Sequence, residues 1–101
     1  MEEIIMNLIS YSGEARSYAM EAIELAKTGD INAAKELIEK SVLQLAEAHK
    51  LQSNLIQFEV NGDKVEISML LIHAQDHLMT TILLKDLANE IVDLYKKIDE
   101  K

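Results

Sequence analysis

Two of the three histidines in this 101-residue chain, His73 and His77, lie four residues apart with Asp76 between them. In a helix, residues three, four and seven positions apart share one face, so these side chains and Thr80 would form one polar stripe. The surrounding residues are mostly apolar, and polar groups in such a setting need partners or serve chemistry. A histidine there can bind a metal or act as a nucleophile through a neutral ring nitrogen.

The first alternative is a metal site that His73 and His77 would share, with His49 as an optional third ligand, because histidines at i and i+4 of a helix can bind one ion. A helical zinc protease would carry glutamate directly after the first histidine, but Ala74 occupies that position. The spacing therefore excludes the protease. It leaves open a metal-binding helical oligomeric interaction module without phosphoryl chemistry.

The second alternative is phosphoryl transfer through a histidine. A transferred phosphoryl group needs positioning and hydrogen-bond donors more than covalent help. Gln75, Thr80 and either His77 or His49 are the side chains that could supply them. The chain has no Gly-rich phosphate loop and no pattern that would build a cavity for a sugar or a nucleotide. The pattern therefore fits a carrier with a macromolecular partner better than an enzyme with its own substrate pocket.

The same residues also have purely structural interpretations. We interpret His49 as a buried histidine that hydrogen-bonds a neighbouring side chain or carbonyl group. His73 and His77 fit a structural role as well as a functional one. Asp76 would cost several kcal/mol, in order of magnitude, if it were buried, charged and unpaired. It therefore needs a cation, a proton or a hydrogen-bond donor.

Three long helices are the elements that must position these residues. Proline is absent and glycine is rare, which favours uninterrupted helices. Turn sequences around Gly29 and Gly62 divide the chain into helices at about 2–28, 30–60 and 65–99. The sequence thus predicts an all-α protein.

The inward faces of the first two helices follow a spacing of three and four residues. The face of the first helix consists of Ile5, Leu8, Ser12, Ala15, Ala19, Ala22 and Ala26. Most of these residues are small. The face of the second helix is apolar except for two polar residues, His49 and Gln52. Its members are Ile31, Ala34, Ile38, Val42, Leu45, His49, Gln52 and Ile56. Gly13 inside the first helix indicates close packing or a kink, and residues 1–12 could instead form a separate turn.

Short connections make sequential helices antiparallel neighbours, which predicts an up-down-up bundle. Counting outward from the second turn places His73 level with position 52 and His77 level with position 48. Counting from the first turn places residues 7–11 at the same height. His49 and Gln52 therefore become candidates to support the histidine pair.

The charge and composition of the chain argue against several classes of function. Eighteen acidic residues against ten basic ones give a net charge of −8, which disfavours nucleic acid binding. No apolar run reaches the roughly 18 residues of a membrane span, and no signal peptide is recognisable. We expect a single cytoplasmic domain over residues 1–101. Residues 65–84 are apolar almost all round, so we also expect an oligomer that buries the third helix.

Three segments of the chain carry a resemblance to a known family: GEARSYAMEAIELAKTGD, AHKLQSNLIQFE and LLIHAQDHLMTTILL. Together they resemble the lactose/cellobiose-type IIA components of the bacterial sugar phosphotransferase system (PTS). The resemblance implies that His73, which opens the HAQDH motif, is the phosphorylated histidine. It would accept phosphate from the histidine phosphocarrier protein and pass it to a cysteine of a IIB component. That component serves a IIC permease that imports a β-linked disaccharide of the lactose, cellobiose or chitobiose type.

The resemblance further implies a homotrimer of three-helix subunits, in which Asp76 from each subunit meets a central divalent cation. An all-carboxylate site favours a hard cation such as Mg²⁺ over zinc. His77 and Gln75 take supporting roles next to His73. His49 and Gln52 stay candidates for more distant support.

Overall fold

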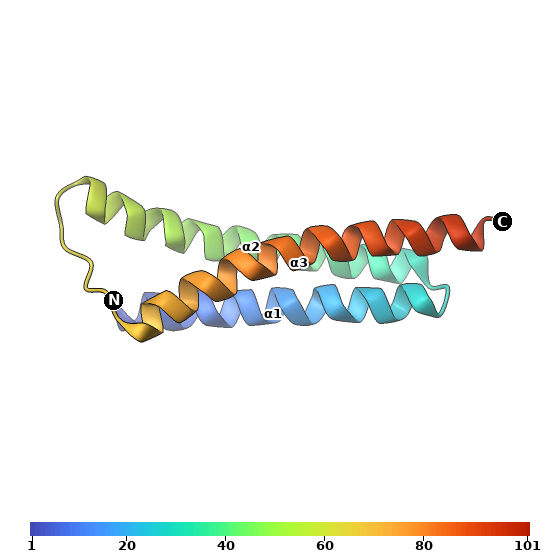
Figure 1. Ribbon diagram of the computed structural model, residues 1–101, viewed down its shortest axis with the longest axis horizontal. Helices are drawn as coiled ribbons and strands as arrows, with labels where there is room; N and C mark the ends of the chain where they lie inside the picture. The colour runs from blue at the N-terminus through green and yellow to red at the C-terminus, as the bar shows by residue number, and fades with distance from the viewer.

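The computed structural model describes residues 1–101 and contains three α-helices and no strand: α1 (Glu2–Lys27), α2 (Ile31–Val60) and α3 (Met69–Asp99). The helices run up, down and up in an elongated bundle of 57 × 19 × 16 Å (Figure 1). At the end where α2 connects to α3, these two helices diverge (Figure 1). The predicted all-α fold, an antiparallel bundle of three helices, is confirmed.

The first turn forms as its sequence predicts. Gly29 adopts a φ of +89°, a left-handed conformation that glycine reaches without steric cost. The carboxylate of Asp30 then accepts a hydrogen bond from the backbone N–H of Ala33 at 3.3 Å and caps α2. This turn places α2 directly against α1.

The second connection is longer than predicted. The expected start of the third helix near residue 65 is wrong, since α3 begins at Met69. Ser68 is extended, with φ −136° and ψ 162°, and its hydroxyl oxygen accepts a hydrogen bond from the N–H of Leu71 at 3.1 Å. A serine in this conformation caps a helix N-terminus, so the chain before it stays non-helical. The longer connection lets α3 start well to one side of α2.

α1 is one continuous helix, and its predicted inward face is confirmed in full. All seven residues of that face are buried. Because most of them are small, the backbones of α1 and α2 approach closely enough for the Ser41 hydroxyl to donate a hydrogen bond to the carbonyl oxygen of Ala15 at 2.8 Å. Gly13 lies inside this helix without interrupting it.

The predicted inward face of α2 is only partly correct. The buried residues of this helix are Ala34, Ile38, Ser41, Leu45, Ala48 and Leu55. Val42, His49 and Ile56, which the spacing placed inward, are exposed. The smaller neighbours Ser41 and Ala48 face the closely packed α1 instead, because a large side chain would hold the two backbones apart.

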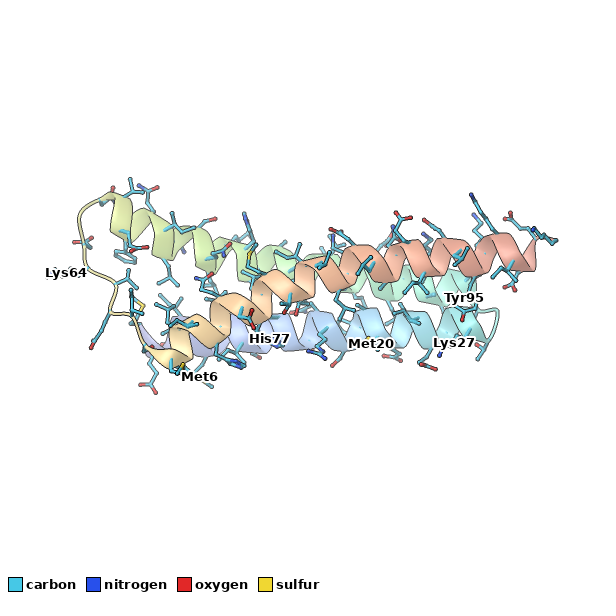
Figure 2. All side chains as sticks on the ribbon, in the orientation of Figure 1. Met6, Met20, Lys27, Lys64, His77 and Tyr95 are labelled. Carbon is cyan, nitrogen blue, oxygen red and sulfur yellow. The ribbon has the colours of Figure 1, made fainter.

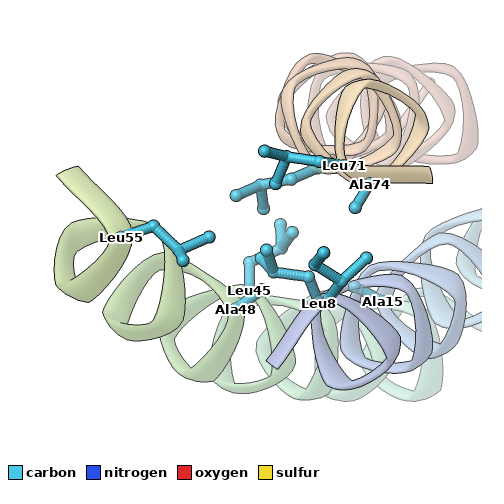
Figure 3. Packing of buried hydrophobic residues seen from close by; sticks show 9 residues of the cluster. Leu8, Ala15, Leu45, Ala48, Leu55, Leu71 and Ala74 are labelled. Carbon is cyan, nitrogen blue, oxygen red and sulfur yellow. The ribbon is translucent and has the colours of Figure 1, made fainter. Parts of the chain in front are cut away.

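The core consists of two clusters along the bundle. One cluster, at the end that carries the histidines, joins all three helices through large side chains such as Leu8, Leu45, Leu71 and Leu78 (Figure 3). The other, toward the opposite end, is built from alanines of all three helices together with Ile38 and Val92. The histidine-bearing part of α3 therefore packs on a layer of leucines.

α3 leaves a row of large apolar side chains in water. This outer stripe of α3 consists of Met69, Ile72, Met79, Leu83, Leu87 and Leu94, each between 52% and 81% exposed. One chain therefore leaves this face of the helix uncovered, and the oligomer expected to bury it stays a prediction. None of the three helices is long and apolar enough to span a membrane.

Candidate functional site

His73 and His77 form a stacked pair on α3. Their ring centroids are 5.9 Å apart and their planes differ by 6°. His73 is exposed, whereas His77 is half-buried. The spacing of one helical turn produces this arrangement, since side chains at i and i+4 lie one above the other. One imidazole is thus open to a reaction partner while the other is held against the protein.

His77 faces α1 at the level of Gly13. A Cβ atom at Gly13 would lie 3.6 Å from Nε2 of His77, and Figure 2 shows His77 on the side of α3 that faces α1. Gly13 therefore lies against α3 within one continuous helix, at a distance where a Cβ would make an ordinary van der Waals contact.

The surroundings of His77 favour its neutral form. Burial lowers the pKa of His77 from 6.5, and the positive charges of His73 and Arg16 act in the same direction, while Asp76 opposes them. A neutral imidazole has one N–H donor and one acceptor nitrogen. His77 can therefore hydrogen-bond a group next to His73 without carrying charge itself.

Gln75 lies on the other side of α3 and contacts α2. The Nε2 of Gln52 donates a hydrogen bond to Oε1 of Gln75 at 2.7 Å and lies 3.7 Å from the sulfur of Met79. The predicted level of Gln52 is thus close to correct, but its partner is Gln75 and not His73. Within one chain these amides brace α2 against α3, and the structure does not bring Gln75 to the histidines.

His49 does not join the site within one chain. The interpretation of His49 as a buried, hydrogen-bonded histidine is wrong, because the side chain is exposed and makes no hydrogen bond. The position that packs inward at this height of α2 is Ala48. The α2 side chain that hydrogen-bonds α3 at this height is Gln52.

Thr80 and Asp76 do not face the same surroundings as the histidines, as a single polar stripe would require. The hydroxyl of Thr80 donates to the carbonyl oxygens of Asp76 at 2.8 Å and of His77 at 3.3 Å, as threonines inside helices often do. It is therefore already occupied within its own helix.

Asp76 is exposed on the outer stripe of α3, three residues before Met79 and seven before Leu83. Its carboxylate points away from the chain's own core.

One chain does not assemble a metal site. No group of three histidine, cysteine, aspartate or glutamate side chains is close enough to hold an ion, so His49 does not join His73 and His77 as the optional third ligand of the metal alternative. Asp76 offers one exposed carboxylate, which is a hard oxygen ligand suited to Mg²⁺. A cation there would need carboxylates from other subunits.

Arg16 lies close enough to His77 for its charge to lower the pKa of that imidazole, and the sequence interpretation did not include it. It is the only arginine in the chain, and its charge acts on His77 from α1. The signal was present in the sequence, because a single arginine in a strongly acidic chain lies one helical turn after Gly13. Only the packing of α1 against α3 connects that turn with the histidines.

The comparison with protein families decides between the two alternatives. Residues 3–96 match the model of the "PTS system, Lactose/Cellobiose specific IIA subunit" family. The chain belongs to this family. As a PTS IIA component, it is part of a phosphotransferase, and His73 is the first histidine of the HAQDH segment on which the resemblance was recognised.

Known PTS IIA components are similar along nearly the whole chain. The lichenan-specific phosphotransferase enzyme IIA component of Bacillus subtilis is 46% identical over 101 residues, which are 100% of this chain and 92% of that one. The crystal structure of the PTS cellobiose-specific enzyme IIA from Bacillus anthracis has 53% identity and a TM-score of 0.97, covering 99% and 92% of the two chains. The IIA(Chitobiose) protein of Escherichia coli, solved in solution as a complex with HPr, has 43% identity and a TM-score of 0.85, covering 97% and 95%.

Proposed function

We propose that the chain is a cytoplasmic phosphocarrier that accepts a phosphoryl group on His73 from the histidine phosphocarrier protein HPr. The observation that carries this proposal is the exposed imidazole of His73 stacked on a half-buried His77. The similar IIA(Chitobiose) protein forms a complex with HPr, which supports the same donor here. In this proposal residues 1–101 form the single domain of the carrier.

The chemistry needs little beyond an accessible nitrogen. A ring nitrogen of His73 uses its electron pair to form a new N–P bond, while the N–P bond of the donor phosphohistidine breaks and leaves its electron pair on the donor ring. The second ring nitrogen of His73 releases one proton to water, and the donor imidazole takes one up. His77 supports the step through its neutral imidazole.

The acceptor in this proposal is a cysteine of a IIB component. The chain contains no cysteine of its own, so a thiol acceptor belongs to a partner. The IIB component serves a IIC permease for a β-linked disaccharide. The names of the relatives described above give lichenan, cellobiose and chitobiose as their specificities, and this range supports a β-linked sugar as the substrate here.

A homotrimer accounts for the outer stripe of α3. Met69, Ile72, Asp76, Met79 and Leu83 follow one another at steps of three and four residues, the spacing of a coiled-coil seam. Three copies that pack along this seam would bury the apolar side chains and bring three Asp76 carboxylates together. A divalent cation such as Mg²⁺ would relieve their mutual repulsion.

The test is phosphate transfer to the intact protein. Incubation with phosphoenolpyruvate, the general phosphotransferase enzyme and HPr should add one acid-labile phosphate, observed by mass spectrometry. The variant His73→Gln should take up none while its helix content by circular dichroism stays unchanged. The variant His49→Gln is the matched control and should be labelled like the wild type.

Two outcomes would contradict the proposal. Labelling of His73→Gln would move the phosphorylated residue to another histidine. No labelling of the wild-type protein by a donor that labels another IIA protein would reject the phosphocarrier altogether.

A further inference from the structure

The only arginine of the chain is without a partner. Arg16 lies on α1, is exposed, and takes part in no hydrogen bond or ion pair within the chain. Four of the nine lysines, by contrast, pair with carboxylates: Lys27, Lys35, Lys50 and Lys85. In a chain with a net charge of −8, a guanidinium group that pairs with none of the eighteen acidic residues is available for another anion.

The position of Arg16 connects it with the histidine pair. Gly13 lies one helical turn before Arg16, and a Cβ at Gly13 would contact Nε2 of His77 at 3.6 Å. Residues at i and i+3 share a helix face, so Arg16 lies on the side of α1 that faces α3. His77 in turn stacks on His73. The side chains of Arg16, His77 and His73 therefore border one stretch of the α1–α3 boundary.

The unpartnered guanidinium group beside the histidines is suited to an anion. No carboxylate of the chain pairs with Arg16, so an anion that lies between the three side chains would be its partner. A phosphoryl group on His73 is such an anion, with close to two negative charges and three acceptor oxygens.

Arginine is the side chain best suited to that anion. Its planar guanidinium matches two phosphate oxygens at once, whereas lysine offers only a point charge. Resting on the phosphocarrier function proposed above, the geometry points to Arg16 as a phosphoryl-binding residue that holds the phosphoryl group on His73. It stabilises the negative charge on the equatorial oxygens as the N–P bond to His73 forms and the donor N–P bond breaks.

The experiment compares the rate of phosphoryl uptake from phosphorylated HPr. Arg16→Gln should lower the rate about a hundredfold, the lower end of the range for losing one electrostatic donor in a site. Arg16→Lys should fall between Arg16→Gln and the wild type, because it keeps the charge but loses the two-pronged contact. The matched control is Lys27→Gln, which removes the same charge from the far end of α1 and should leave the rate unchanged.

A second measurement separates binding from folding. The ³¹P NMR resonance of the phosphohistidine should shift in Arg16→Gln and not in Lys27→Gln, while helix content and sedimentation stay the same in all variants. An unchanged uptake rate and an unchanged resonance in Arg16→Gln would overturn the inference and leave the phosphocarrier function intact. Failure of the wild-type protein to take up phosphate would overturn both.

Discussion

The central residue pair of this protein divides two tasks between two identical side chains. His73 is exposed and stacks on His77, which is half-buried between α3 and α1. Exposure leaves His73 free to meet a donor and an acceptor in turn. Burial keeps His77 in place and neutral. The difference arises from a single turn of helix, because α1 covers one ring and not the other.

An NMR titration of the imidazole resonances tests this difference. The pKa of His77 should lie below 6.5, because burial and the nearby positive charges of His73 and Arg16 disfavour protonation more than Asp76 favours it. At pH 6.5 more than half of His77 should therefore be neutral, and its charge should appear only as the pH falls further. Arg16→Gln should move the midpoint upward. A midpoint above 6.5 would show that Asp76 dominates the environment of His77.

At the scale of the elements, the inward face of α1 was predictable and that of α2 was not. Small residues at a regular spacing define the α1 face without ambiguity, and all seven are buried. In α2, apolar side chains occur on more than one side, so a spacing that includes Val42 and Ile56 looks as good as one that includes Ser41 and Ala48. Only the closeness of α1 selects the small residues.

The site was predictable to a similar degree. The HAQDH segment identified the histidines from their spacing alone. The packing of helices far apart in sequence decides which side of α3 faces α1. This packing brings His77 next to Gly13 and leaves His49 exposed on α2. The start of α3 was missed because Ser68 has no acidic or amide side chain at its third following position to complete a capping box.

The cap of α3 can be tested by Ser68→Ala. Loss of the hydroxyl leaves the N–H of Leu71 without its partner at 3.1 Å, which should cost about 1 kcal/mol of unfolding free energy. Urea unfolding at one fixed protein concentration measures the difference. Ser53→Ala on the exposed surface of α2 is the control and should change stability by less than about 0.5 kcal/mol. Equal effects of both substitutions would argue against the cap.

At the scale of the whole molecule, the outer stripe of α3 is the feature that one chain cannot explain by itself. Six large apolar side chains lie in water along this helix, and Asp76 interrupts them where a coiled-coil seam would place it inside. The proposed trimer therefore has two contributions, apolar packing along the stripe and a cation at Asp76. Their relative importance is open to experiment.

Asp76→Leu separates the two contributions. The variant should remain trimeric and be as stable as the wild type or more so, because replacing buried charges by apolar groups is often neutral or stabilising. Analytical ultracentrifugation, with and without a chelator, measures the assembly. Leu83→Asp, which places a second charge on the same stripe, should instead dissociate the subunits. Monomers in Asp76→Leu would show that the cation holds the trimer together.

The divergence of α2 from α3 has a consequence for motion. Leu55 is the last buried residue of α2, and the five residues after it, 56–60, are all exposed. The helical hydrogen bonds there are backed by no buried side chain, so local opening should cost little. Hydrogen–deuterium exchange should be fast over 56–60 and slow over 34–48. The end of the molecule next to Gln52 and the histidines would then open locally on a timescale at which the alanine-packed end stays folded.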